Sequence, residues 1–465
     1  PTLPKGISMI GLPIGSSESD PRSVLNDSGA QLARWNPRKN EWKLFPNEAF
    51  ASLIPPDTGP TEIVDTPPAG LGFFSKLTRT AIFNYAGMPL LPDETYSIGL
   101  KMGSNGAPGW NQFSNPFPAT VPWSQVEVRS GTQTMSIADA IAARLILSRP
   151  FRYIQNPNDP NLPGEYETLS GDALTLKPFE ANWLKVGKDV TLLIRGPTAI
   201  GSKGHRAHLP IIPEYPVSTI EGWQLRLMAF CGNTQDSFNF VGMADGASNR
   251  FDASDSPEPP IIPGTAIRLR MRRTTWGRYA DDYSRDMRPS SSKATWDFTI
   301  ESHLPAAEVV LAWEELEDVP SQYRLLLTDL VTGSQIPMRI RSSYRFQTPT
   351  QDTVHVRHFR LTALPRSMER LIISNVQLKI TVKNSYLNFS LSAPARISVA
   401  LRTLAGRTVR RIVVNRAMGK GRQSINWDLR DFRGHKMPPG FYICEILGED
   451  ELGQPTITIH TFAIH

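Results

Sequence analysis

Short runs in which apolar residues alternate with polar or smaller ones recur along this 465-residue chain. In one run Ile267, Leu269 and Met271 alternate with arginines, and in another Ile397 and Val399 alternate with smaller residues. Because successive side chains of a strand point to opposite faces, this pattern predicts half-buried strands. The 40 prolines and 33 glycines are spread between the runs, where they favour turns. The chain is therefore expected to be all-β.

The length of the chain is too great for one ordinary core and predicts two to four domains. Strand spacing and Gly/Pro-rich stretches divide it into three parts. We expect a duplicated β-rich region over 1–199 (copies of about 1–100 and 101–199), a jelly-roll-like β-sandwich over 200–384, and a final domain over 385–465.

The duplication is predicted from matching pieces in matching order. Each copy opens on a strand that runs into a Gly or Asn-Pro turn, "ISMIGLPIG" and "GWNQFSNPFPATVPWSQV". A short helix candidate follows, and in the second copy, over Ser136–Leu147, Ser136 is positioned to cap it. Next comes an aromatic strand pair around an Asn-Pro turn, "LARWNPRKNEWKLF" and "FRYIQNPNDPNLPGEYETL". Both copies close on strands with a lysine at the same place, Lys76 and Lys185.

The last 80 residues read as a smaller sandwich. A hairpin turn is predicted at Ala405-Gly406-Arg407, and Trp427 is expected to lie between the sheets. In the terminal strand the apolar positions change phase, from Ile457 and Ile459 to Phe462 and Ile464. This slip of one residue predicts a bulge near His460–Thr461.

Several short motifs of this segment carry a family resemblance: Leu404 to Arg407, Trp427-Asp428, Arg430-Asp431, Gly434, and Pro438 to Tyr442. They resemble the immunoglobulin-like domain first described in flagellar hook-capping proteins, and are similar to the C-terminal sorting domains of type IX secretion substrates. The family usually has Gly where this chain has Leu429. Residues 1–384 resemble, more loosely, the duplicated regions of multidomain bacterial surface proteins of this kind. The resemblance implies a secreted, bacterial protein with a scaffold or secretion role and no chemistry.

Residues that carry chemistry in other proteins are present without the spacing that the chemistry needs. His205 and His208, and His355 and His358, have i, i+3 spacing, which in a strand points to opposite faces. Paired carboxylates over Glu314–Asp318 could serve a glycosidase, yet charge runs between strands are usually solvated loops. The chain has no GxSxG, Walker or GxGxxG motif. We therefore predict no catalytic residue, no cofactor and no enzyme activity.

An acidic loop over 243–260 carries oxygen donors suited to Ca²⁺, of which Asp252 and Asp255 are the candidates. The regular calcium-loop spacing is absent, and Asp also forms turns. We predict no metal site, with these two residues as the alternative.

The net charge of +6 is concentrated in residues 386–465, which have eleven basic and six acidic residues. These basic residues are not interleaved with aromatics, so we expect a solvated face and no nucleic-acid partner. Cys231 and Cys444 lie in strand-like apolar runs and are expected to be buried thiols. There is no stretch of 18 apolar residues, so no membrane span is expected. The start at Pro1 suggests a processed extracellular or cell-surface product whose leader is absent.

Two functions compete. The first is a structural subunit of a surface layer, sheath or filament that self-assembles with copies of itself or with other surface proteins through β-domain contacts. The N-terminal arm Pro1–Ser8 and the strand Thr456–Ile464 are suited to reach a neighbour. The second is a carbohydrate-binding or adhesive module, accessory to a secreted hydrolase, because Trp35, Trp42 and six further tryptophans could stack sugars of a polysaccharide.

Overall fold

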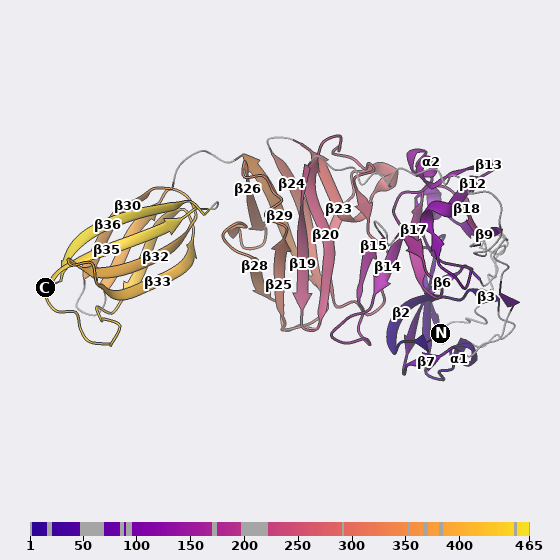
Figure 1. The fold of residues 1–465 in the computed structure, drawn as a ribbon, viewed down its shortest axis with the longest axis horizontal. Helices are drawn as coiled ribbons and strands as arrows, with labels where there is room; N and C mark the ends of the chain where they lie inside the picture. The colour runs from indigo at the N-terminus through magenta and orange to yellow at the C-terminus, as the bar shows by residue number, and fades with distance from the viewer. Residues whose placement is uncertain are drawn as a thin grey trace, which may run out of the picture. The chain divides into compact units, whose positions relative to one another are not determined.

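The computed structural model describes residues 2–15, 21–46, 69–83, 88–89, 95–169, 174–196, 222–290, 293–351, 354–365, 371–380, 385–450 and 453–464. Strands dominate these residues, and the two α-helices are short (Figure 1). The prediction of a multidomain all-β protein is confirmed. The chain divides into two compact units. Unit 1 comprises Pro1–Ser290, Trp296–Leu311 and Arg345–His358, and unit 2 comprises Ser291–Thr295, Ala312–Tyr344 and Phe359–His465. The predicted domain boundaries stay predictions.

The N-terminal part of unit 1 is built from two copies of one motif. The first copy contains β1 (Thr2–Leu3), β2 (Gly6–Gly11), β3 (Ile14–Gly15), α1 (Pro21–Val24), β4 (Gln31–Asn36), β5 (Glu41–Phe45), β6 (Gly72–Leu77), β7 (Ala81–Ile82) and β8 (Met88–Pro89). The second contains β9 (Thr95–Leu100), β10 (Gly109–Ser114), β11 (Val121–Pro122), β12 (Val126–Ser130), β13 (Gln133–Ser136), α2 (Ile137–Ala142), β14 (Phe151–Ile154), β15 (Glu165–Thr168), β16 (Thr175–Leu176), β17 (Ala181–Val186) and β18 (Val190–Arg195).

Strand order shows that the two copies share a topology. The four-stranded sheet of the first copy has the order β2-β6-β4-β5, and that of the second has the equivalent order β10-β17-β14-β15. The first strand of each copy pairs with a strand near the end of that copy, β1 with β7 and β9 with β18. The duplication expected from the sequence is therefore present in the fold.

The two copies contact each other at residues that occupy the same position in each copy, Gly11 against Ser114 and Gly72 against Ala181. Gly11 pairs with Gly72 in the first copy, as Ser114 pairs with Ala181 in the second. A Cβ on Gly11 would lie 2.0 Å from the Cβ of Ser114, and one on Gly72 would lie 2.8 Å from the Cβ of Ala181. Glycine is thus required on one side of each contact, because two side chains cannot occupy that space. The Ser114 hydroxyl donates to the carbonyl oxygen of Leu71 at 2.9 Å and joins the copies further.

Aromatic side chains are exchanged reciprocally between the copies. Trp183, on the central strand of the second copy, lies 6.3 Å from Trp35 and 5.8 Å from Trp42 of the first, measured between ring centroids. Phe74, at the equivalent place in the first copy, lies 5.1 Å from Tyr153 of the second. The rings meet edge to face, an arrangement that adds to the free energy of burial. Each copy therefore completes the core of the other.

The region that begins at Gly222 contains the longest strands of unit 1. Its strands, several shared with unit 2, are β19 (Gly222–Cys231), β20 (Thr234–Ala244), β21 (Ser256–Pro257), β22 (Ile267–Arg273), β23 (Asp281–Pro289), β24 (Ala294–Ser302), β25 (Glu308–Glu314), β26 (Tyr323–Asp329), β27 (Gln335–Pro337), β28 (Ser343–Gln347) and β29 (His355–Pro365). In unit 1 the sheet runs β24-β22-β23-β20-β19, with β20 and β23 parallel. In unit 2, β26 pairs with β27 and with β29.

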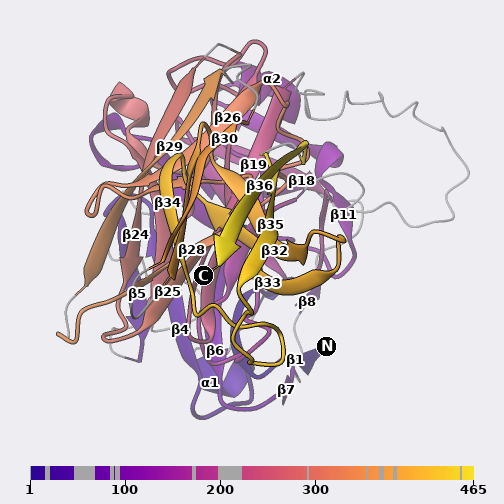
Figure 2. The same ribbon diagram turned by 90° about the vertical axis from the view of Figure 1, so that its left-hand side faces the viewer.

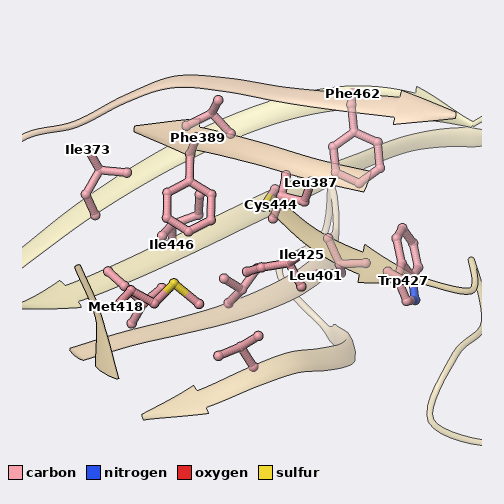
Figure 3. Close-up of a cluster of buried hydrophobic side chains, with 14 of the residues drawn as sticks. Ile373, Leu387, Phe389, Leu401, Met418, Ile425, Trp427, Cys444, Ile446 and Phe462 are labelled. Carbon is pink, nitrogen blue, oxygen red and sulfur yellow. The ribbon is translucent and has the colours of Figure 1, made fainter. Parts of the chain in front are cut away.

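The final sandwich lies in unit 2 and has seven strands, β30 (Ile373–Ile380), β31 (Ser385–Leu391), β32 (Ala395–Thr403), β33 (Thr408–Met418), β34 (Gly421–Trp427), β35 (Gly440–Glu449) and β36 (Pro455–Ile464). They form the sheets β30-β31-β34 and β33-β32-β35-β36 (Figure 2). Apolar residues of both sheets, Phe389, Leu401 and Ile446 among them, converge in one core (Figure 3). Trp427 is buried in that core, as expected. β30, which precedes residue 385, pairs with β31 along most of its length.

Two local signals of the sequence are found where they were expected. The Ser136 hydroxyl accepts from the backbone N–H of Asp139 at 3.1 Å and caps α2. The helix is shorter than predicted, ending at Ala142, because Arg144 adopts a left-handed φ of 55° that the α-helix cannot contain. At the β32–β33 hairpin Gly406 has φ 82° and donates to the carbonyl oxygen of Thr403 at 2.8 Å.

The bulge predicted near His460–Thr461 is absent. The register of β36 with β35 is unbroken from Pro455, opposite Glu449, to Ile464, opposite Gly440. Phe462 and Ile464 therefore face the core, while Ile457 and Ile459 face outward and are 61% and 62% exposed. The prediction was wrong because it assumed that all four apolar side chains had to be buried.

The position at which the family usually has glycine retains a glycine conformation. Leu429 has φ 56°, in the left-handed region that costs an L-residue about 1–2 kcal/mol. Its side chain packs against the core, and its carbonyl oxygen accepts from the backbone N–H of Met437 at 2.8 Å. Packing therefore offsets the backbone strain.

We predict that Leu429→Gly changes the free energy of unfolding by less than about 1 kcal/mol, because relief of strain and loss of packing nearly cancel. Leu429→Ile should cost about 2 kcal/mol, because a β-branched residue is disfavoured at this φ. Calorimetry of the full chain would compare the two variants. If the glycine variant were less stable than the isoleucine variant, the backbone of Leu429 would not be strained.

Candidate functional site

A cluster of buried and half-buried polar residues lies where the second copy meets the strands β20 to β23, within unit 1 (Figure 1). We call this contact the junction. Glu165 on β15 accepts from the backbone N–H of Ser237 on β20 at 2.8 Å and also accepts from the Gln235 amide. Tyr166 donates its hydroxyl to the carbonyl oxygen of Pro260 at 3.0 Å. Trp42 of the first copy donates its indole N–H to the carbonyl oxygen of Ile261 at 2.8 Å. Both copies are thus fastened to the β20–β23 region.

A buried ion pair adds to this attachment. The Lys185 ammonium on β17 contacts the Asp281 carboxylate on β23, and the lysine side chain is only 3% exposed. The same ammonium lies 5.2 Å from the centre of the Trp110 ring. Lys76, at the equivalent place in the first copy, is exposed. The matching lysines of the sequence therefore have different roles.

Arg268 on β22 is the centre of a charge network at the junction. Its Nε lies 3.1 Å from Oε1 of Glu258 and its Nη2 lies 2.9 Å from Oε2, a two-pronged contact. Nη2 also lies 3.0 Å from Oδ2 of Asp282. Arg270 contacts both oxygens of Asp282 at 2.9 Å and Glu301 at 2.9 Å. The side chains of Arg268, Glu258 and Asp282 are largely buried, so water screens their charges only weakly.

Burial shifts the titration of these carboxyl groups. Burial raises the pKa of Glu258 to about 8, although Arg268 opposes the shift. Burial also raises the pKa of Asp236 to about 6, against the N–H of Leu269, which donates to its Oδ2 at 2.7 Å. For Asp282 burial acts in the same direction, but Arg268 and Arg270 prevail and hold the pKa below its usual value. The junction therefore holds two carboxyl groups that take up protons near neutral pH.

These groups surround a pocket of about 50 Å³. Glu165, Asp236, Glu258 and Arg268 are its charged lining, and Phe151 and Phe238 form part of its apolar wall. Carboxyl groups with raised pKa values serve as general acids in glycosidases. Here, however, the volume suits a few water molecules, far less than the roughly 300 Å³ at which small-molecule sites begin. The arrangement suits the joining of modules better than catalysis.

The calcium candidates Asp252 and Asp255 accept hydrogen bonds from backbone N–H groups of their own loop and, for Asp255, of β23. Asp252 accepts from the backbone N–H groups of Ser248 at 2.6 Å and Ser254 at 2.8 Å. Asp255 is buried and accepts from the backbone N–H of Met287 at 2.9 Å. Burial, together with the neighbouring carboxylates of Asp286 and Asp252, raises the pKa of Asp255 well above its usual value. Across the described ranges, His, Cys, Asp and Glu side chains form no group of three or more that could hold a metal ion.

The remaining candidates lie apart from the junction. His205 and His208 are outside the described residues. His355 and His358 point to opposite faces of β29, and the run from Glu314 to Asp318 begins at the last residue of β25. Of the eight tryptophans considered for sugar stacking, Trp42 is half-buried and the other seven are buried: Trp35, Trp110, Trp123, Trp183, Trp223, Trp276 and Trp313.

Sequence reasoning missed the junction because it treated the arginines of "IRLRMRR" as the polar alternates of a strand. Arg268 is instead buried against Glu258 and Asp282. The sequence signal that could have revealed these ion pairs was the acidic pair Asp281-Asp282, which follows shortly after three alternating arginines. Glu165 and Asp236 carried no recognisable spacing.

The fold and the junction define a multidomain all-β protein whose modules are fastened by buried polar contacts. In the part of the chain that the structure describes, no helix is long and apolar enough to cross a membrane.

No protein-family model matches the chain, and no curated protein matches it. Among solved structures it is similar to dimeric latent PorU from Porphyromonas gingivalis, at 10% identity and a TM-score of 0.18, over 53% of this chain and 30% of PorU. It is also similar to the β-glucuronidase of Ruminococcus gnavus, at 13% identity and a TM-score of 0.13, over 36% of each chain. The chain thus spans about a third of these proteins, and TM-scores this low carry no functional argument.

We predict that Lys185 and Asp281 are energetically coupled. Breaking a buried pair by Lys185→Met should cost about 1–3 kcal/mol, at the lower end because Asp281 is a third exposed and Arg272 lies 3.9 Å away. A double-mutant cycle with Asp281→Asn should give a coupling of about 1 kcal/mol or more. The exposed pair Arg345–Glu308 is the control and should give less than about 0.5 kcal/mol. Equal coupling in the two pairs would contradict the role of burial.

Proposed function

We propose that the chain is a secreted bacterial surface protein that acts as a structural subunit and assembles with other copies through the outer face of its final sandwich. The observation that carries the proposal is the exposure of Ile457 and Ile459 on β36. In the register of the sheet, Leu447 lies opposite Ile457 and is 38% exposed. Together these three residues form what we call the β36 patch.

The chemistry of the β36 patch favours a second copy as the occupant. β36 is the last strand of its sheet, and contiguous apolar groups on an exposed sheet face mark interaction surfaces. A patch that packs against itself across a two-fold axis needs no complementary surface elsewhere. A biological contact of this kind would bury about 1,000 Å² or more in total, so neighbouring residues of β35 would also take part.

The structure changes the segment that we assign to the contact. The N-terminal arm does not extend freely: Thr2 pairs with Ile82, Leu3 pairs with Ala81, and Leu3 is buried. β36 also donates to its own sandwich, from the Thr456 hydroxyl to the carbonyl oxygen of Leu371 at 3.3 Å. The outward face of β36, rather than either arm, is therefore the surface open to a partner.

Secretion and a bacterial cell-surface location rest on the motif residues around Trp427 and on the resemblance that they carry. The absence of turnover rests on the small volume of the junction pocket and on the use of its carboxylates in contacts between modules.

We predict that the full chain self-associates with increasing concentration. The double variant Ile457→Thr/Ile459→Thr should lower the association constant by at least about tenfold, because apolar contact area is lost. Threonine keeps the β-branched shape, so the melting temperature should hardly change. Sedimentation velocity measures the association. Ile82→Thr is the matched control, because Ile82 is 66% exposed and lies in unit 1.

A wild-type chain that stays monomeric at high concentration would contradict the proposal. If that monomer also bound a glycan array tightly, the carbohydrate-binding alternative would replace it. Association that is equal in wild type and in the double variant would remove the β36 patch from the contact.

A further inference from the structure

The junction combines three partly buried carboxyl groups, contributed by two modules, with a single guanidinium. Three carboxyl groups line its pocket, Glu165 from β15, and Asp236 and Glu258 from the β20–β23 region. One guanidinium, that of Arg268, lines the same pocket, and it is shared with Asp282. When all three carboxyl groups are ionised, like charges therefore face one another across the contact at low dielectric.

Surrounding groups do not remove this imbalance. Arg270 is occupied by Asp282 and Glu301, and Arg226 on β19 donates to the carbonyl oxygen of Ser237 at 2.8 Å. The remaining charged or titratable groups that face the pocket or its Arg268 network are Tyr166 on β15, Arg272 on β22, Asp281 and Asp282 on β23, and Glu301 on β24. Lys185 is engaged with Asp281. Among the described residues around the pocket no further cation is placed to compensate these carboxylates, so protonation is the means of neutralisation that the described network leaves.

The geometry points to the junction as a proton-controlled joint, in which protonated Glu258 and Asp236 hold the duplicated region against the β20–β23 region and their ionisation loosens it. The inference is independent of assembly through the β36 patch.

The direction of the effect follows from proton binding. The pKa of Glu258 rises from 4.5 to about 8 on folding, and that of Asp236 rises from 3.8 to about 6. The folded chain therefore binds more protons than the unfolded chain between these values, and its stability falls as pH rises through them. The contribution is fully present below about pH 4 and is lost above about pH 8.

The experiment follows two readouts in the full chain between about pH 5.5 and about pH 9. The first is the melting temperature of unit 1, which should fall by about 5 °C or more. The second is the hydrogen-exchange protection of the Trp42 indole N–H, which bonds across the junction to Ile261. After correction for intrinsic exchange, this protection should fall by about tenfold or more in the wild type.

Variants assign the effect to named groups. Glu258→Gln imitates the protonated side chain and should reduce the loss of protection at high pH by at least half, and Asp236→Asn should act in the same direction. Glu167→Gln is the matched control: Glu167 lies on the same strand as Glu165 but pairs with Arg152 and is a third exposed. It should follow the wild type at every pH.

Constant Trp42 protection in the wild type across this pH range would overturn the inference without any variant. Equal pH dependence in Glu258→Gln, Asp236→Asn and the wild type would overturn it as well. If Glu258→Gln fails to fold at low pH, the carboxyl group serves as an ionised partner of Arg268, which also overturns it.

Discussion

The reciprocal exchange of aromatic rings between the two N-terminal copies is the contact on which the rest of unit 1 depends. The central-strand ring of each copy also packs on rings of the other copy, Trp183 on Trp35 and Trp42, and Phe74 on Tyr153. Close approach at Gly11 and Gly72 makes this possible. The strands that reach the β20–β23 region, β15 and β17, are held in place by the same cluster. The two copies therefore share one core and are expected to fold as a single cooperative unit.

The contacts inside unit 1 use buried charged residues, whereas the final sandwich exposes apolar residues. In unit 1, charged residues such as Arg268 and Lys185 are buried at contacts between modules, where apolar residues would be the simpler choice. In the final sandwich, apolar residues such as Ile457 are exposed. Buried charge gives the internal contact a defined geometry and a dependence on pH. Exposed apolar surface suits an external contact that needs little geometric precision.

Local signals in the sequence predicted local structure well. Period-two alternation located most strands, Ser136 and Gly406 marked a cap and a turn, and the motif around Trp427 located the last core. The failures have one cause. A pattern of alternation states that two faces differ, but not whether the second face meets water or another module. Arg268 was assigned to water and is buried, and Ile457 was assigned to a core and is exposed. Glu165 and Asp236, which line the same pocket, are separated by 71 residues and share no motif.

The two cysteines have a consequence beyond packing. Cys231 lies in unit 1 and Cys444 in unit 2, and both are buried. Burial raises the pKa of each thiol, to about 12 for Cys444, so that almost no thiolate is present at neutral pH. In an oxidising medium each unit thus resists disulfide scrambling and oxidation for as long as it remains closed. In such a medium the oxidation of the two thiols is consequently limited by the opening rates of the units rather than by the reactivity of the sulfur.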